Sequence, residues 1–239
     1  MLYFYIGLAV FILVGTSIAG SASANFWDAV KKRGEMPCSI DMTAADFAYK
    51  VLRDKRLPVK VTQTPGKLTD FYSSKNKIIA ISEELYNSDS VVALAITAHE
   101  IGHAISDYQD KAAYVAHQYL AHVCYYMNYV FYILLAGLIA TLIAPISSFW
   151  VLLFVFSIAA VILLWFILRL ITVQNEKLAS KIGIEILKEY GATKEEIRSS
   201  KKILKAALIT YVGEIFMPFV RIWRFFLKLL DKTIGRLFR

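Results

Sequence analysis

The segment His99-Glu100-Ile101-Gly102-His103 combines residue types and a spacing that suit metal-assisted hydrolysis. Residues four positions apart share one face of a helix, so His99 and His103 can present two imidazoles to one metal ion. Glu100 lies where a carboxylate can take a proton from a water molecule held by that metal. Zinc lowers the pKa of such a water to about 7, so the pattern predicts zinc-dependent attack on a carbonyl group.

The residues around this segment indicate that its helix is buried. The flanks are apolar or small, over Ala95–Ala98 and Ala104–Ile105. The alternative to a metal site is a pair of core histidines that are hydrogen-bonded on a buried helix. Burying the polar side chains of His99, Glu100 and His103 together without a ligand is unfavourable, so the metal interpretation is preferred. On this interpretation the glycine within the segment leaves room beside the metal.

A catalytic zinc also needs a third protein ligand and one open position. Four residues are candidates: Asp107, His117, His122 and Glu176. Asp107 is on the same helix and would have to reach one metal from a third turn, and the two further histidines suit polar positions at a membrane entrance. Glu176 could complete the site from a second helix, or be an exposed glutamate at a helix start. The residues alone leave these possibilities open.

The elements that must position these side chains are predicted from residue periodicity. A long helix should run from Ser88 or Ser90 to Ser106, with Ser88 as its N-cap. Before it, apolar spacing predicts a helix over Thr43–Arg53, alternation predicts a strand over Val59–Thr62, and residues 71–81 are typical of a β-hairpin. These elements form a small α+β domain.

The composition points to a membrane. The chain has 239 residues, of which 57% are hydrophobic and 19% charged, and its mean hydropathy is +0.51. Ordinary soluble domains are less apolar and more charged. Three stretches are long enough to span a bilayer: Leu2–Ala19, Leu120–Ala144 and Phe149–Leu168. The first could instead be a signal peptide cleaved near Ala22–Ala24, but its start carries no Lys or Arg, which favours a retained span.

The net charge of +8 lies entirely after residue 168. Residues 28–111 carry 12 basic and 12 acidic side chains, and residues 169–239 carry 15 basic and 7 acidic ones. Lys and Arg follow the first and last predicted spans, which places residues 25–119 and 169–239 in the cytoplasm by the positive-inside rule. The chain is therefore predicted to be an integral membrane protein, and nucleic-acid binding is disfavoured.

Residues 219–239 are predicted to form an interfacial helix. Basic residues separated by three or four positions fall on one stripe of a helix, with aromatic and aliphatic residues between them. Such a helix would lie on anionic membrane lipids, or alternatively pack as a solvated basic edge on the protein itself. The basic residues are Arg221, Arg224, Lys228, Lys232, Arg236 and Arg239.

The sequence resembles the YugP-like neutral zinc metallopeptidases, which are bacterial membrane proteins of the gluzincin type. The resemblance implies that His99, His103 and Glu176 are zinc ligands and that Glu100 is the catalytic base. It also implies a plasma-membrane location. It covers most of the chain, and the segments that carry it are Gly66–Tyr72, Ile81–Ser88, Ala98–Ile105, Glu176–Ser180 and Ala206–Val212.

Two further roles are suggested by zinc peptidases of this kind. The strand before the active helix, Lys77–Ser82, could bind an extended peptide by its edge, or be an ordinary hairpin strand. Tyr211 could stabilise an oxyanion, or be a buried aromatic near the membrane. The family's C-terminal region looks like a further span, whereas Glu214, Pro218 and Arg221 interrupt residues 206–220 here.

Together these features predict a mostly helical membrane protein. It should have about three transmembrane helices and a small α+β zincin-like catalytic domain with a short β-hairpin. The expected function is zinc-dependent endopeptidase activity on peptides or proteins; the alternatives are a non-proteolytic scaffold with a structural zinc and a lipid-binding adaptor. The predicted segments are a first span (1–24), the catalytic domain (25–119), a transmembrane hairpin (120–168), a helical region with the third ligand (169–218) and the interfacial helix (219–239).

Overall fold

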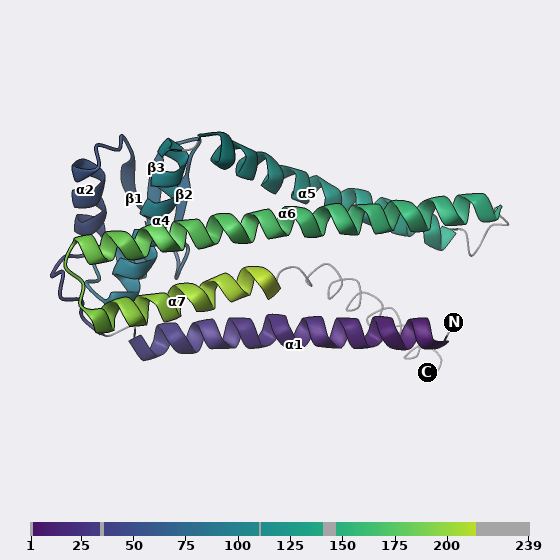
Figure 1. Ribbon diagram of the computed structural model, residues 1–239, viewed down its shortest axis with the longest axis horizontal. Coiled ribbons are helices and arrows are strands. Elements are labelled where there is room, and N and C mark those ends of the chain that lie inside the picture. The colour runs from purple at the N-terminus through teal and green to yellow at the C-terminus, as the bar shows by residue number, and fades with distance from the viewer. Residues whose placement is uncertain (1, 34–35, 110, 141–146, 214–239) are drawn as a thin grey trace. The chain divides into compact units, whose positions relative to one another are not determined.

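The chain is mostly helical, with one small sheet (Figure 1). The computed structural model describes residues 2–33, 36–109, 111–140 and 147–213. The predicted interfacial helix at 219–239 therefore lies outside the described residues. The helices are α1 (Leu2–Arg33), α2 (Ala44–Asp54), α3 (Glu83–Tyr86), α4 (Val91–Gln109), α5 (Lys111–Ala140), α6 (Ser148–Glu189) and α7 (Lys194–Gly213), and the strands are β1 (Lys60–Thr64), β2 (Phe71–Ser73) and β3 (Ile78–Ser82).

The chain divides into two compact units. One consists of Met1–Gln109 together with Glu176–Arg239, and the other is Asp110–Asn175. The first unit contains the sheet and the His99–His103 helix, so it is the unit that concerns the candidate site. The second unit contains α5 and the apolar part of α6, where an added Cβ at Gly137 would clash with the Phe154 ring.

The sheet has the strand order β1-β3-β2. β2 and β3 are antiparallel, with Phe71 opposite Ala80, which confirms the predicted hairpin. β1 pairs in parallel with β3 over its whole length, from Lys60 opposite Ile78 onward. Of the two interpretations of Lys77–Ser82, the structure favours the ordinary hairpin strand, because β1 pairs with β3 along its length and β2 pairs with Ile78–Ala80 on the other side.

Hydroxyl side chains cap the N-termini of two helices, α2 and α4. The Thr43 side chain accepts a hydrogen bond from the Asp46 backbone N–H and caps α2. α4 begins at Val91, and the Ser90 hydroxyl accepts from the Ala93 N–H at 3.2 Å. Ser90, rather than the predicted Ser88, is therefore the N-cap of α4. The Ser88 hydroxyl instead accepts from the Ser90 backbone N–H.

α1 packs along α7 within the first unit (Figure 1). The helix is continuous to Arg33, nine residues beyond the boundary at residue 24 that the sequence suggests. The small residues of the alternative cleavage site lie inside this helix, and Ala22 is buried.

One described helix, α6, is long and apolar enough to cross a membrane by length and composition. Its apolar part matches the predicted third span. A shorter apolar segment, Tyr125–Leu138, lies within α5. The predicted number of about three transmembrane helices is not confirmed by the described residues.

Candidate metal centre

α4 carries the two histidines and the glutamate on a helix that is buried along most of its length. Glu100 is buried, and the His99 and His103 side chains are only 14% and 13% exposed. Burial follows from the apolar and small residues on both sides of the segment, as the sequence predicts. The helix therefore holds three polar side chains in a largely dry environment.

The residues of α6 that follow Asn175 cross α4 at very short range, and two glycines permit this approach. A Cβ added at Gly102 would lie 2.3 Å from the Ala179 carbonyl oxygen, and one added at Gly183 would lie 2.8 Å from the Ala98 carbonyl oxygen. Gly102 thus makes room for the neighbouring helix backbone, which replaces the interpretation that it leaves space beside a metal. The crossing brings Glu176 against the histidines.

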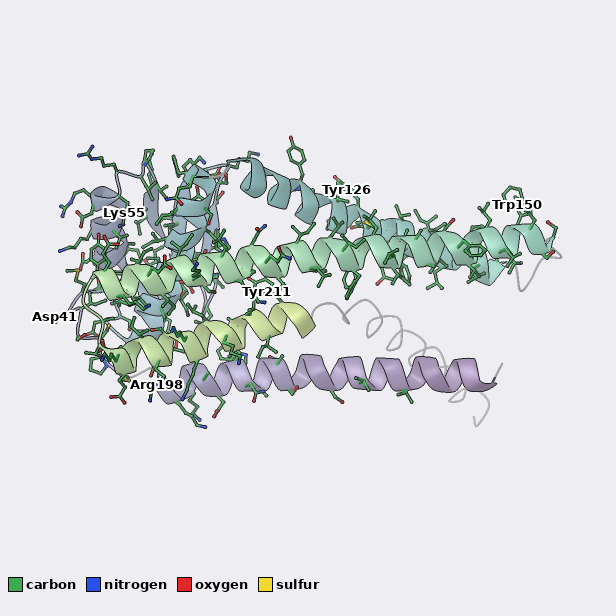
Figure 2. The ribbon with its side chains drawn as sticks, in the orientation of Figure 1. Asp41, Lys55, Tyr126, Trp150, Arg198 and Tyr211 are labelled. Carbon is green, nitrogen blue, oxygen red and sulfur yellow. The ribbon has the colours of Figure 1, made fainter. Side chains whose placement is uncertain are left out.

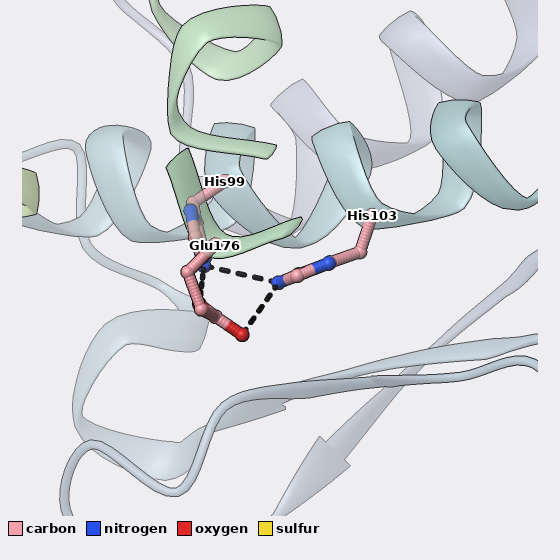
Figure 3. A group of neighbouring side chains, drawn as sticks. All are labelled: His99, His103 and Glu176. Atoms are coloured by element: carbon pink, nitrogen blue, oxygen red, sulfur yellow. Dashed lines mark hydrogen bonds and ion pairs between the residues drawn. The ribbon is translucent and has the colours of Figure 1, made fainter. Parts of the chain in front are cut away.

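Ligand atoms from these three residues converge on one point (Figure 3). His99 Nε2 lies 3.2 Å from His103 Nε2. One Glu176 oxygen lies 3.2 Å from His99 Nε2, and the other lies 3.6 Å from His103 Nε2. The structure therefore brings together the three residues that the sequence and the family resemblance single out.

These distances fit a zinc ion. In a tetrahedral zinc site with bonds of about 2.0–2.1 Å, neighbouring ligand atoms lie about 3.3 Å apart. Glu176 Oε2 is buried and makes no hydrogen bond among the described residues. A buried carboxylate oxygen without a hydrogen bond is unfavourable unless another ligand satisfies it. The donor set of two imidazoles and one carboxylate is also a known combination for catalytic zinc.

The same packing shifts the pKa values of the acidic groups. Burial raises the pKa of Glu100, and the nearby histidines only partly offset this effect. Burial acts on Glu176 in the same direction, but the contacts of its carboxylate with the His103 and His99 ring nitrogens outweigh it and hold its pKa well below the usual range. Glu176 is therefore set up as a permanent carboxylate ligand, whereas the Glu100 carboxyl group can hold a proton more readily.

Ser180 orients the first histidine. Its hydroxyl lies 3.1 Å from His99 Nδ1. When His99 Nε2 serves as a metal ligand, Nδ1 carries the hydrogen and donates it to the serine oxygen, which fixes the tautomer and the ring orientation. Ser180 lies one helical turn after Glu176, so one face of α6 supplies both a ligand and a partner for a second ligand.

A cavity of about 140 Å³ adjoins two of the three candidate ligands, His99 and Glu176, and also Glu100. Asp70 lies on its polar side, and its carboxylate accepts hydrogen bonds from the Ser82 backbone N–H and hydroxyl. Tyr211, near the C-terminal end of α7, also lines the cavity (Figure 2). Its apolar walls come from several elements and consist of Phe26, Leu68, Ile96, Ile203, Leu204, Ala207 and Leu208.

Asp107, the other candidate ligand on α4, is not part of this group. Asp107 Oδ2 accepts hydrogen bonds from the Tyr72 hydroxyl at 2.6 Å, from the Ser74 hydroxyl at 2.7 Å and from Lys77 Nζ. Asp107 thus joins α4 to the hairpin. His122 is in the second unit, and the side chain of His117 lies outside the described residues.

Sequence analysis did not assign roles to Asp70 and Ser180. Both lie within segments that carry the family resemblance, Gly66–Tyr72 and Glu176–Ser180. Their place in these segments is the sequence feature that could have pointed to a role for them. The spacing of Ser180 from Glu176 also places both on one helix face. Neither signal says which atom the side chain would meet, because that depends on how α6 crosses α4.

Comparisons with known proteins indicate the family of the chain. The model of a family described as "Putative neutral zinc metallopeptidase" matches residues 8–230. A protein of Bacillus subtilis (strain 168) named "Putative membrane protease YugP" is 26% identical over 215 residues, which cover 87% of this chain and 92% of that protein. No solved structure matches the chain. Since the family match extends over nearly the whole sequence and includes the ligand cluster, the chain belongs to the neutral zinc metallopeptidase family.

Proposed function

We propose that this protein is a membrane-embedded zinc endopeptidase in which His99, His103 and Glu176 hold the metal and Glu100 is the catalytic base. The observation that carries the proposal is the convergence of three ligand atoms, 3.2–3.6 Å apart, beside a buried glutamate. Three protein ligands are the number that catalytic zinc sites use, since the fourth position must admit water or substrate. A scaffold with a structural zinc would need a fourth protein ligand.

The chemistry divides between the metal and the buried glutamate. Held by His99, His103 and Glu176, a zinc ion would supply a water molecule of lowered pKa and would polarise the substrate carbonyl. Glu100 accepts the proton of the attacking water and passes it to the leaving amine. Burial favours the neutral carboxylic acid, so Glu100 can hold this proton between the two transfers. Ser180 keeps His99 in the required tautomer.

Tyr211 is the proposed donor to the oxyanion that develops on the carbonyl oxygen. The support is its position, because it lines the same cavity as His99, Glu100 and Glu176. A phenol can donate one hydrogen bond to such an oxygen. The apolar side chains that line the cavity would exclude water and accept an apolar substrate side chain.

The membrane part of the proposal rests on α6 and on the relative's name. α6 has the length and composition of a membrane span, and the relative from Bacillus subtilis is named a membrane protease. We propose a plasma-membrane location with the first unit, which contains the metal site, facing the cytoplasm. Lys and Arg follow the first and last predicted spans, and the positive-inside rule places such flanks in the cytoplasm. The segment division, including an interfacial helix at 219–239 on anionic lipids, remains part of this proposal.

The replacement Glu100→Gln tests the catalytic role. The variant should keep zinc, measured by elemental analysis of the purified protein, because all three ligands remain. Its kcat on a fluorogenic peptide should fall by about 100- to 10,000-fold, which is the usual contribution of general acid–base catalysis. Glu195→Gln, an exposed change of the same kind on α7, is the control and should cleave at the wild-type rate.

Two results would contradict the proposal. The first is cleavage by Glu100→Gln at the wild-type rate. The second is a zinc ion closed by a fourth protein ligand with no water, which would identify a structural site. His99→Ala distinguishes loss of the metal from loss of the catalytic base. This variant should lower zinc content as well as activity, whereas Glu100→Gln should lower activity alone.

A further inference from the structure

A lysine-lined groove lies between α6 and α7 beside the metal-site cavity. It encloses about 430 Å³. Its basic side chains all come from these two helices, and Glu185 is its one acidic lining residue. The five lysines that define this lysine groove are Lys177, Lys181, Lys188, Lys201 and Lys205.

The lysines face the groove because of their spacing. Lys177, Lys181 and Lys188 are four and seven positions apart on α6, and Lys201 and Lys205 are four apart on α7, so each set shares one helix face. All five are exposed, and none forms an ion pair with another residue that the structure describes. Like charges that face one another are unfavourable, and an anionic occupant would relieve this repulsion.

The groove adjoins the metal-site cavity. Ser180, Leu204 and Leu208 line both hollows. Between Lys177 and Lys188, α6 rises by about 16 Å, which is the length of about five extended residues. A bilayer headgroup layer is only about 5–8 Å deep on each side. An extended polypeptide therefore fits the length of the groove better than a lipid headgroup does.

We infer that the lysine groove binds an acidic stretch of the substrate polypeptide adjacent to the bond that is cleaved. The inference rests on the proposed peptidase function and adds a substrate class to it. Substrate carboxylates would pair with the lysines, while apolar side chains of the same stretch contact Ile184, Leu204 and Leu208 on the groove floor. The substrates would be proteins with Asp or Glu near an apolar cleavage point.

The test compares matched fluorogenic peptides with the full-length protein in a neutral detergent. The peptides share one cleavable centre and carry a run of Glu or of Gln on either side. The wild type should show a higher kcat/KM for the Glu peptide. An exposed ion pair is worth about 1.5- to 5-fold in affinity, so Lys181→Gln with Lys205→Gln should lower the Glu/Gln ratio by about 2- to 25-fold. High salt should lower the ratio in the wild type, because it screens exposed charges.

The matched control removes two lysines of α7 that lie outside the groove. Lys194 and Lys202 line a different hollow, and their replacement by Gln changes the net charge equally. This double variant should keep the Glu/Gln ratio of the wild type. A loss of preference that is equal in both double variants would overturn the inference, because it would reflect net charge alone.

A binding measurement separates this inference from the proposed function. Fluorescence anisotropy of the labelled Glu peptide with the Glu100→Gln protein needs no cleavage. If binding depends on Lys181 and Lys205 but no peptide is cleaved by the wild type, the groove stands and the peptidase proposal fails. Cleavage without preference for Glu and without dependence on these lysines overturns the groove alone. The inference is also overturned if the double variant Lys181→Gln, Lys205→Gln loses binding to phosphatidylglycerol vesicles but keeps the wild-type Glu/Gln ratio. That result would assign the groove to lipid.

Discussion

Two buried carboxylates, Asp107 and Glu176, differ in their chemistry because they differ in their partners. Asp107 accepts hydrogen bonds from a lysine and two hydroxyl groups, which are all donors. Glu176 faces two imidazole nitrogens, which can themselves be metal ligands. From the sequence, both residues were candidates for the third ligand. The distinction arises from the hairpin in one case and from the helix crossing in the other.

Asp107→Asn should destabilise the protein in a pH-dependent way. Burial alone would raise the pKa of Asp107, but the hydrogen bonds from Lys77, Tyr72 and Ser74 outweigh it and lower the pKa. The carboxylate therefore stabilises the fold fully above its unfolded pKa of about 3.9, and this stabilisation is lost as the pH falls through the lower folded value. At pH 7 the variant should lose about 1–3 kcal/mol of unfolding free energy.

Thermal melts followed by circular dichroism at neutral and acidic pH would measure this effect. The difference in Tm between wild type and Asp107→Asn should be largest at neutral pH and should shrink below about pH 4. Asp28→Asn is the control, since it breaks the exposed Asp28–Lys32 pair and should lower the unfolding free energy by less than about 1 kcal/mol. A Tm difference that persists unchanged into acid would argue against the role of the carboxylate charge.

The residues that share a helix turn were predictable, and those that meet from distant segments were not. His99, Glu100 and His103 act together because of spacing within one helix, which the sequence displays directly. Glu176 required the family resemblance, and Ser180 received no role. Both depend on contacts between residues about 80 positions apart, and no local pattern encodes such contacts.

At the scale of elements, the site depends on how closely α4 and α6 approach. Gly102 and Gly183 lie on opposite helices, and each faces the backbone of the other helix. This pair of contacts determines where Glu176 meets the histidines. The close crossing explains why a buried helix with good helix-forming neighbours tolerates a glycine in its middle.

Gly102→Ala and Gly183→Ala should each separate the two helices and weaken the metal site. The added Cβ would lie 2.3 Å from a backbone carbonyl oxygen in the first variant and 2.8 Å in the second, so the backbones must move apart. We expect Gly102→Ala to lower zinc affinity by at least about 10-fold, comparable with the loss of a residue that orients a ligand. Competition with a chelator would measure the affinity.

Gly20→Ala is the matched control for these glycine variants. Gly20 lies inside helix α1, and an added Cβ there meets nothing within 4 Å. Alanine should therefore leave zinc affinity unchanged and should stabilise the helix slightly. Zinc affinity at the wild-type level in Gly102→Ala would show that the crossing does not control the ligand geometry.

The elements were largely predictable one at a time, but their pairing was not. The helix over residues 43–53, the hairpin and the long α4 follow from local periodicity and caps. The parallel pairing of β1 with β3 joins strands that are separated by β2 in the chain. Local alternation carries no signal for this pairing, which is why the sequence left open a free edge on the strand before α4.

At the scale of the whole molecule, the distribution of charge predicts the orientation in the membrane. With the native cysteines changed to serine, Lys75→Cys on the hairpin turn should react with a membrane-impermeant maleimide only after cell lysis. Ser148→Cys, at the start of α6, should react in intact cells. Both positions are exposed, so access depends on the side of the membrane. The reverse labelling pattern would place the catalytic unit outside.

The position of α1 limits how this protein could be shortened for biochemical work. Phe26 of α1 lines the cavity beside the metal ligands, and α1 packs along α7. A truncated chain that starts after residue 33 would therefore lose part of the substrate-facing wall and leave the partner side of α7 bare to solvent. Its activity would be reduced even though every ligand remained, and its exposed apolar surface would promote aggregation. An inhibitor screen therefore needs the N-terminal helix in place.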